Sequence, residues 1–282
     1  MPRRTIDREI AAEGTALHAG STIRLTLAPA ASGRGVMFCR SDMEDREIPA
    51  SYGRVAETRL GTVIDDGQGA RVGVIEHLMA AVAGAGIDDL LVTLDGPEPP
   101  ILNGDALSYL ELLDQAGVRE QKGERPTIKI LKPVKVEHGE ASAALFPADA
   151  YAFDFEIVFS SAAIGTQRLE WNFSTEGFRR DIAPARTFGF IQELEALQKA
   201  GLGRGASLEN TLAIDGDRVI NKDLLRFPDE FVRHKILDAV GDMALAGAPL
   251  IGCFVGRRSG HALNNQLLRA LFSDPANYTR VT

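Results

Sequence analysis

The stretch that decides the fold is RFPDEFVRHKILDAVGDMALAG, residues 226–247. Apolar residues recur along it at helical spacing and predict a helix with one face in a core: Ile236, Leu237, Val240, Met243 and Ala244. His234 and Asp238 lie four positions apart and therefore share a face, and Asp242 follows one turn later. The predicted helix thus combines a core face with a stripe of one imidazole and two carboxylates, and that stripe requires an explanation.

The composition indicates an ordinary globular protein. The chain has 282 residues, enough for two domains, with 45% hydrophobic and 25% charged residues. A net charge of -8 argues against nonspecific nucleic-acid binding. The only cysteines, Cys39 and Cys253, are far apart and suit a reducing cytosol. Neither a secretory signal nor an apolar run of about 20 residues is evident, so we expect a cytoplasmic protein without an integral membrane segment.

Hydrophobic patterning predicts strands and helices in both halves of the chain. In the first half we expect two strands in 21–40, a helix at 72–86, a strand at 88–96 and a helix at 105–117. The polar segment 119–127 contains a glycine and a proline and is the best candidate for a linker. In the second half we expect strands at 128–139, 141–147, 150–159 and 249–256, and helices at 190–203, 226–247 and 262–272.

The two halves share more than the order of their elements. In each half a helix headed by histidine (His77 or His234) is followed by a strand and then by Gly-x-Ala-Leu, at 104–107 and 260–263. The spacing from histidine to glycine is 27 positions in one half and 26 in the other. We therefore predict an α+β fold made of two related two-layer α/β domains, 1–121 and 122–282, that arose by internal duplication. A pseudo-twofold axis between them would bring the two histidines close together.

Two histidines and one aspartate provide a ligand set for a divalent metal ion. His234 and Asp238 share a helix face, and His77 would arrive from the other half. A hydrolytic metal site uses three protein ligands and leaves one position open. Two nitrogens and one oxygen suit Zn²⁺ or Fe²⁺ better than Mg²⁺ or Ca²⁺, which take mostly oxygen ligands. The alternative is a solvated His–Asp pair on a helix surface, worth about 0.3–0.5 kcal/mol.

Three further residues fit roles around such a metal ion. Glu76 is adjacent to His77, where it could take a proton from the attacking water. His261, at the expected start of the last helix, is a candidate acid for the leaving group, and Asp242 is the carboxylate that would keep it protonated. The plainer alternatives are a helix N-terminal carboxylate for Glu76 and a cap or core residue for His261.

Five motifs together resemble the UDP-3-O-acyl-N-acetylglucosamine deacetylase family, the zinc amidases of lipid A biosynthesis. They are VIEHLMAAVAGAGIDDLLV (74–92), PEPPILNGDA (97–106), ARTFGF (185–190), LRFPDEFVRHKILDAVGD (225–242) and SGHALNNQLL (259–268). The resemblance runs from about residue 3 to 280. It implies that the helices lie sandwiched between two sheets. For the site it implies these residues: zinc ligands His77, His234 and Asp238, general base Glu76, acid or electrostatic partner His261 oriented by Asp242, and oxyanion donor Thr187.

The resemblance also implies how the substrate binds. Residues 188–214 would be an insert that forms an apolar passage for the fatty acyl chain, with Phe188, Phe190, Ile191 and Leu194 as possible lining. The alternative is that this segment buries those side chains against its own domain. Lys235 and Arg258 would meet the diphosphate, or else be surface cations. Phe159 would stack on the uracil, or else be a core residue.

Two segments depart from the family pattern. Asp-Gly-Ser is usual where this chain has Asn103-Gly-Asp105, and the usual GLHTG is replaced by ALHAG at 16–20. Without the resemblance to this family, Thr187 would be interpreted as an ordinary strand or turn residue. None of these departures touches the predicted metal ligands.

The sequence therefore predicts a monomeric metal-dependent amidohydrolase. Its substrate would be UDP-3-O-acyl-N-acetylglucosamine, a nucleotide sugar with a fatty acyl chain, from which it would release acetate in the committed step of lipid A biosynthesis. Two alternatives stay open. One is a metallohydrolase that acts on a different acylated amide. The other is a non-enzymatic duplicated binding module in which the polar stripe pairs helices.

Overall fold

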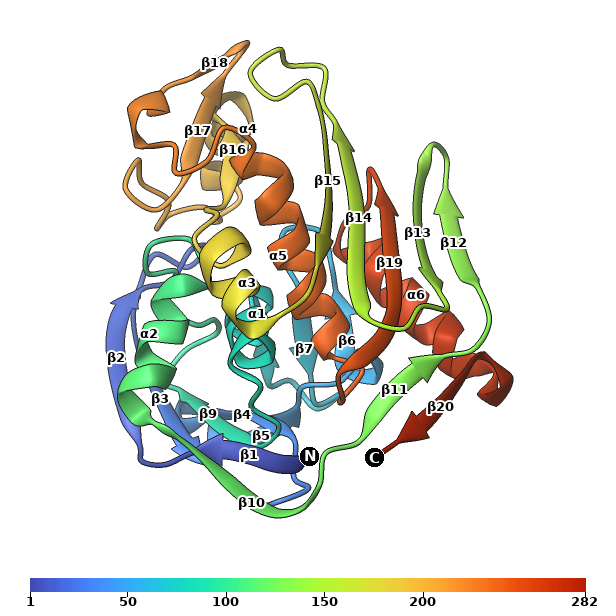
Figure 1. Ribbon diagram of the computed structural model, residues 1–282. Coiled ribbons are helices and arrows are strands. Elements are labelled where there is room, and N and C mark those ends of the chain that lie inside the picture. The colour runs from blue at the N-terminus through green and yellow to red at the C-terminus, as the bar shows by residue number, and fades with distance from the viewer.

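Two β-sheets form the outer layers of the protein (Figure 1). The computed structural model describes residues 1–282 apart from the side chain of Glu195. The first sheet has the spatial order β2 (Ile10–Thr15), β3 (Thr22–Pro29), β9 (Leu90–Leu94), β4 (Val36–Arg40) and β5 (Arg46–Pro49). The second contains β12 (Val134–His138), β13 (Ala141–Phe146), β19 (Leu250–Arg257), β14 (Tyr151–Val158) and β15 (Thr166–Asn172), together with β11 (Thr127–Ile130) and β20 (Tyr278–Val281).

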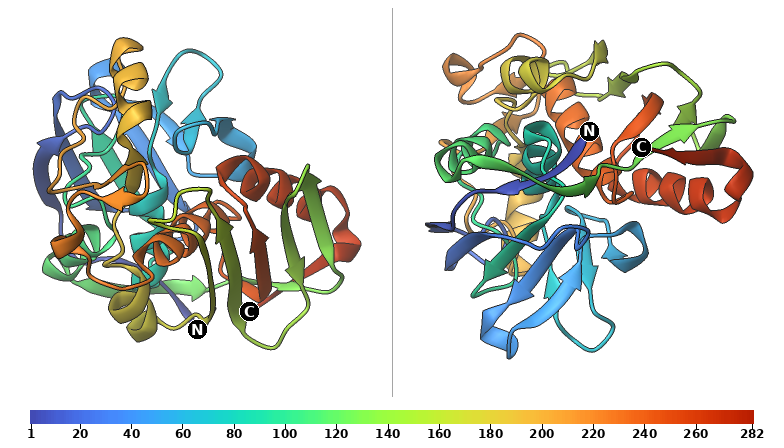
Figure 2. Two further views of the ribbon diagram at one scale, coloured as in Figure 1. Left: turned by 90° about the horizontal axis from the view of Figure 1, so that it is seen from above. Right: turned by 60° about the horizontal axis from the view of Figure 1, so that its bottom comes forward.

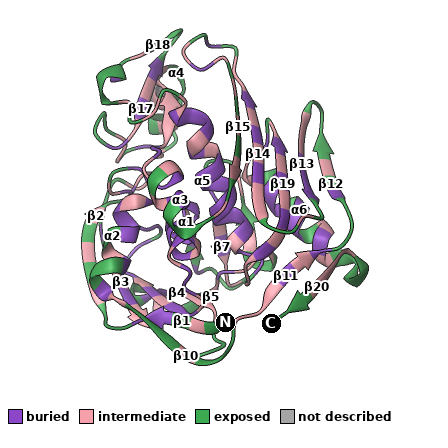
Figure 3. Cartoon of the chain, in the orientation of Figure 1, coloured by how far each residue is buried: buried purple, intermediate pink, exposed green. Residues whose placement is uncertain are grey.

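Four helices lie between the two sheets. They are α1 (Glu76–Ala85), α2 (Leu107–Ala116), α5 (Glu230–Ala244) and α6 (His261–Ser273). Helix α1 packs on α5 at the centre, α2 contacts α1 and the first sheet, and α6 contacts α5 and the second sheet (Figures 1 and 2). The facing sides of α1 and α5 are buried, as the purple segments of Figure 3 show. The predicted α+β fold is confirmed.

The two sheets have the same topology. In the first, β3 pairs antiparallel with β2 and β9, and β4 pairs parallel with β9 and antiparallel with β5. In the second, β13 pairs antiparallel with β12 and β19, and β14 pairs parallel with β19 and antiparallel with β15. This agreement supports an internal duplication, which stays a prediction, as do the domain limits 1–121 and 122–282.

The remaining elements join or extend these layers. Two small sheets are β6 (Val55–Glu57), β7 (Val63–Asp65) and β8 (Arg71–Val72), and β16 (Phe188–Phe190), β17 (Leu212–Asp215) and β18 (Arg218–Val219). Helix α4 (Ile191–Lys199) follows β16, and α3 (Thr175–Gly177) runs into a π-helical turn (Phe178–Ile182). Short 3₁₀ turns are Ser41–Met43, Tyr52–Arg54, Lys222–Leu224 and Pro275–Asn277.

The linker candidate at 119–127 is extended rather than irregular. Its residues belong largely to β10 (Val118–Glu124), which pairs antiparallel with β1 (Pro2–Ile6). A polar composition was compatible with this because most of β10 is exposed. The linker between the halves is therefore fastened to the N-terminal strand.

The central helix is shorter than the predicted 226–247. It begins at Glu230 because Pro228 biases the preceding residue away from helical backbone. It ends at Ala244, and the chain turns at Gly247, whose φ of 78° is in the left-handed region. The predicted helix at 72–86 likewise begins only at Glu76, because Val72 pairs with β7.

Helices α1 and α5 touch backbone to backbone at Gly241. A Cβ at this position would lie 2.0 Å from the carbonyl oxygen of Glu76. We therefore expect Gly241→Ala to force the helices apart, lowering the free energy of unfolding by about 3 kcal/mol and reducing activity. Urea unfolding checks the first effect. Gly53→Ala is the control, because its Cβ would meet no atom of the described residues within 4 Å and stability should hardly change. Equal unfolding midpoints for the two variants would contradict the close helix crossing.

Candidate metal centre and active site

Three buried side chains converge where α1 meets α5. The Nε2 atom of His77 lies 3.6 Å from Oδ1 of Asp238, and Nε2 of His234 lies 3.4 Å from the same oxygen. The two imidazole rings are edge to face, with centroids 4.9 Å apart. One potential ligand atom from each residue lies within 4.8 Å of the other two. The predicted meeting of residues from distant parts of the chain therefore occurs.

The protonation and hydrogen bonding of these side chains fit a metal ion. Within the described part of the chain, Oδ1 of Asp238 is buried and has no hydrogen-bond partner. Burial, reinforced by His234, lowers the pKa of His77 to about 3, and burial lowers the pKa of His234 too. Burial acts in the opposite sense on Asp238, but His234 and Lys235 outweigh it and hold the pKa of that carboxyl below its ordinary value. Neutral imidazoles and an ionised carboxylate are the forms that bind metal ions.

Outer contacts fix the direction of two of these side chains. Nδ1 of His234 lies 3.1 Å from the carbonyl oxygen of Ala185, so it donates a hydrogen there and leaves the lone pair of Nε2 facing Asp238. The ammonium group of Lys235 donates to the other oxygen of Asp238, Oδ2, at 2.5 Å. One carboxylate oxygen is thus held by Lys235, and the other is free for the centre.

The carboxylate of Glu76 borders the metal centre at the first residue of α1. Its Oε2 accepts a hydrogen bond of 2.9 Å from the backbone N–H of Thr62, and burial raises its pKa to about 7. A Cβ at Gly61 would lie 2.8 Å from Oε1 of Glu76, so only glycine fits beside it. Val74, two residues earlier, has a φ of 52°, which a β-branched residue rarely adopts. Strain of this kind, of order 1–3 kcal/mol, is typical of functional sites.

His261 faces Glu76 from the start of α6. Its Nε2 lies 3.9 Å from Oε1 of Glu76, and its Nδ1 lies 2.8 Å from Oδ2 of Asp242. Burial opposes protonation of the imidazole, but the carboxylates of Asp242 and Glu76 outweigh it and raise the pKa of His261 to about 9. Asp242 is fixed in turn by the Thr62 hydroxyl at 2.6 Å and the Asn264 amide at 2.8 Å. The site therefore holds one imidazole charged beside two that are neutral.

An apolar cavity of about 660 Å³ opens from the metal centre. Glu76, His77, Asp238 and Thr187 all belong to its lining. The apolar lining comes mainly from β16, α4 and the segment after it, and includes Phe188, Phe190, Ile191, Leu194, Leu197 and Leu208. Beside the lining residue Gly203, the chain is bound to the first half, because the backbone N–H groups of Arg204 and Gly205 donate to the carbonyl oxygens of His18 and Leu17.

Three of the four predicted substrate-binding residues line a cavity. Phe159 and Phe188 pack edge to face, with centroids 5.7 Å apart, in the apolar cavity. Lys235 lines this cavity and also a second one of about 520 Å³ that is bordered by His261. Arg258 is paired with Glu140 at the surface and, among the described residues, does not belong to the lining of either cavity.

The side chain of Asp105, in the loop that departs from the family pattern, is bound by residues outside the metal centre. Oδ1 of Asp105 accepts hydrogen bonds from the backbone N–H (3.0 Å) and hydroxyl (2.8 Å) of Ser108 at the start of α2. Its other oxygen, Oδ2, pairs with the guanidinium group of Arg226. Asp105 therefore links the first half to the segment before α5, although His261, its counterpart in the predicted repeat, faces Glu76.

Sequence reasoning missed the polar residues that hold the site from outside. They are Thr62, Asn264, Arg186 and Glu230. Thr62 lies in a loop without periodicity and gave no signal. Asn264 and Glu230 lie inside the quoted motifs, and a helical projection that placed Asn264 beside His261 was the available clue.

Comparison with known proteins agrees with this geometry. The family model described as UDP-3-O-acyl N-acetylglycosamine deacetylase matches residues 3–273. The chain is 48% identical over 264 residues to a protein of Phenylobacterium zucineum, covering 93% of this chain and 90% of that protein. It is 45% identical over 277 residues to one of Myxococcus xanthus (98% and 88%) and 42% identical over 275 residues to one of Vibrio vulnificus (96% and 90%). All three relatives bear the name UDP-3-O-acyl-N-acetylglucosamine deacetylase.

Across the described residues, no helix combines the length and the apolar character needed to cross a bilayer.

Proposed function

The chain belongs to the UDP-3-O-acyl N-acetylglycosamine deacetylase family, and from this premise we propose how its residues remove acetate from the 2-acetamido group of UDP-3-O-acyl-N-acetylglucosamine in lipid A biosynthesis. The observation that carries the proposal is the convergence of His77, His234 and Asp238 beside Glu76 and His261, in the lining of an apolar cavity. An assay of acetate release tests it. The 3-O-acylated nucleotide sugar should be hydrolysed far faster than simple N-acetyl sugars. Equal rates would favour a hydrolase for another acylated amide.

We propose that His77, His234 and Asp238 hold Zn²⁺, with Fe²⁺ as the alternative that the same ligand atoms accept. A metal ion bound there supplies a Lewis acid for the amide carbonyl and lowers the pKa of a coordinated water towards about 7. Asp238 and His234 come from one helix and His77 from another, so the site forms only when α1 and α5 are packed. Elemental analysis of the purified protein identifies the metal.

The proton transfers are assigned to Glu76 and His261. Glu76, whose pKa burial raises to about 7, takes the proton of the attacking water as general base. His261 is held protonated by Asp242 and lies across the site from Glu76, so it stabilises negative charge and donates a proton to the departing amine. Thr187 lines the same cavity, where its hydroxyl would donate a hydrogen bond to the oxyanion of the tetrahedral intermediate.

The two cavities suggest where each part of the substrate lies. The apolar cavity, extending from the centre along β16 and α4, suits the 3-O-acyl chain, and the predicted insert 188–214 supplies most of its apolar lining. The contacts of Phe159 with Phe188 favour the acyl chain for both residues over the predicted stacking of Phe159 on uracil. The second cavity, which Lys235 lines, suits the nucleotide diphosphate. Arg258 would reach it only by leaving Glu140.

The protein is proposed to act in the cytoplasm as a monomer. The free thiols of Cys39 and Cys253 suit a reducing compartment, where nucleotide sugars are made.

A larger side chain in the apolar cavity should lower kcat/KM more for a long-chain substrate than for a short-chain one. Ala213→Phe places a ring among the lining side chains, so kcat/KM for a long-chain substrate should fall about 10-fold or more, because the alkyl chain loses buried surface. A short-chain substrate should be affected by less than about twofold, since it does not reach the ring. Steady-state kinetics with both substrates checks this. Lys199→Phe, on the exposed side of α4, is the control. A uniform loss on both substrates would count against the acyl passage.

The alkaline limb of the pH–rate profile should report His261. The protonated form is active, so activity is present below its pKa of about 9 and is lost as the pH rises through that value. Asp242→Asn removes the carboxylate that faces the imidazole, so the pKa of His261 should fall and the limb should move to lower pH by about one unit or more. The pH dependence of kcat/KM in both proteins measures the shift. An unmoved limb would assign it to another group.

A further inference from the structure

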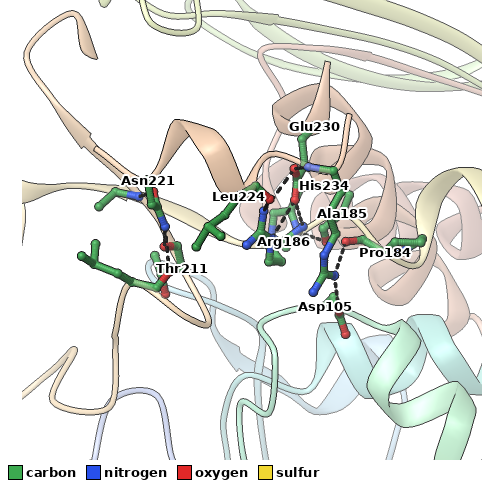
Figure 4. A network of polar contacts seen from close by, with 12 residues as sticks. Asp105, Pro184, Ala185, Arg186, Thr211, Asn221, Leu224, Glu230 and His234 are labelled. Carbon is green, nitrogen blue, oxygen red and sulfur yellow. Dashed lines mark hydrogen bonds and ion pairs between the residues drawn. The ribbon is translucent and has the colours of Figure 1, made fainter. Parts of the chain in front are cut away.

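We propose that the buried pair Arg186–Glu230 positions the metal ligand His234 and the cavity-lining Thr187 as one unit. Figure 4 shows the network in which Arg186 and Glu230 join His234 through Ala185. The inference rests on the metal site proposed above, and it assigns Arg186 and Glu230 as positioning residues that touch neither the substrate nor the metal ion.

Glu230 gathers donors from two segments of chain. It is the first residue of α5 and is fully buried. Its Oε1 accepts hydrogen bonds of 3.0 Å from both the backbone N–H and the Nε of Arg186. Its Oε2 accepts one of 2.6 Å from the backbone N–H of Arg226. Because the backbone of Arg186 is bound as well as its side chain, the carboxylate fixes the path of the chain here.

The hydrogen bonds of Glu230 and His234, together with the chain between their partners, form a closed ring that includes the metal ligand His234. Ala185, directly before Arg186, accepts the hydrogen bond of 3.1 Å from Nδ1 of His234. His234 lies one helical turn after Glu230 on the same face of α5. The helix that carries the ligand therefore also carries Glu230, which anchors the segment that orients the ligand. With Nδ1 occupied as a donor, the imidazole must keep the tautomer that presents Nε2 to the centre.

The same segment sets the place of Thr187. Its backbone N–H donates to Gly104 at 2.8 Å, and its carbonyl oxygen accepts from Leu212 at 2.9 Å. One residue earlier the chain is pinned by Glu230. Ala185 thus orients His234, Arg186 binds Glu230, and Thr187 lines the cavity. A shift of Arg186 would therefore move Ala185 and Thr187 together.

Arg226 fastens this unit to the first half of the chain. Its guanidinium group donates to the carbonyl oxygen of Pro184 at 2.6 Å and pairs with Asp105, the residue that departs from the family pattern. Asp105 also holds the start of α2 through Ser108. The segment 184–187 is therefore held by Glu230 of α5 and, through Arg226, by Asp105 just before α2. These contacts join the two halves of the chain near the metal centre.

Stability alone does not account for such a pair. Burying an Arg–Glu pair seldom stabilises a fold more than apolar residues of the same volume would. Arg3–Asp89 is a second largely buried pair, joined at 2.7 and 2.8 Å, with Asp89 also accepting from the backbone N–H of Gly35. It ties β1 to the start of β9, outside both cavity linings among the described residues, and serves as a matched control.

The test compares Glu230→Gln with Asp89→Asn. In metal-free protein, ¹⁵N NMR of His234 should show one Nδ1–H tautomer in the wild type and a mixture in Glu230→Gln. Zn²⁺ affinity, measured by competition with a chelator, should fall about 10- to 100-fold and kcat should fall with it, while KM changes little. Asp89→Asn should lose thermal stability without altering the tautomer or the affinity. A Glu230→Gln protein with wild-type tautomer and affinity overturns the proposal and leaves the pair a purely structural role.

A second variant covers the case in which Glu230→Gln does not fold. Arg226 is partly exposed, so Arg226→Gln should fold, release Pro184 and Asp105, and show a smaller change of the same kind in tautomer and affinity. Wild-type values in this variant overturn the proposal. The tautomer is read without metal, so a wild-type protein that binds no Zn²⁺ would refute the metal site separately.

Discussion

Glu76→Gln should bind metal as the wild type does and lose turnover by about 10²- to 10⁴-fold, the contribution of a positioned general base. The amide has the shape of the carboxylate, and its oxygen can still accept the hydrogen bond from the backbone of Thr62. What it cannot do is take a proton from water. Metal content by elemental analysis and kcat on the nucleotide sugar measure the two halves of this prediction.

A matched variant separates loss of the base from loss of a buried carboxylate. Glu98 is also buried and accepts backbone N–H groups, those of His18 and Ala19, without lying in the cavity lining among the described residues. Glu98→Gln should therefore retain most of the turnover. Full activity in Glu76→Gln would refute its assignment as the base.

His77→Ala should remove the metal ion and reduce turnover by about 10³-fold or more. The ligand set would fall from three to two, leaving only the pair on α5, and both the Lewis acid and the activated water would be lost with the ion. Metal stoichiometry after dialysis, together with kcat, checks the prediction. His138→Ala, which changes an exposed histidine at the end of β12, should keep its metal.

The metal content of the wild type and of His77→Ala also tests the alternative of a non-enzymatic binding module. If the wild type carries no stoichiometric metal, and none is lost on His77→Ala, the polar stripe is a helix-pairing network. Oδ1 of Asp238 lies between two neutral imidazoles and has no hydrogen-bond partner among the residues that the structure describes. This argues against a helix-pairing network, which would satisfy a buried carboxylate oxygen.

Hydrophobic periodicity predicted a helix or strand correctly where the residues of that segment alone determine its conformation. The spacing of His234 and Asp238 placed both on one face of α5, and alternation or apolar runs located β3, β4, β9, β14 and β19. Periodicity was less reliable where the conformation of a segment depends on pairing with another segment. The exposed, polar β10 was taken for a linker, since its strand conformation comes from hydrogen bonds to β1. Strands β16, β17 and β18 were not predicted, although the helix that follows β16 was.

The sequence alone determined which side chains are available and which of them share an element: His234, Asp238 and Asp242 follow from the period of a single helix. Only the tertiary structure decided how far each pKa is shifted and what holds each side chain in place. Glu76, His261 and the ring through Arg186 and Glu230 depend on burial and on contacts between segments far apart in the chain. The physical reason is that periodicity reports one element's own geometry, whereas desolvation and hydrogen bonding depend on which other elements surround it.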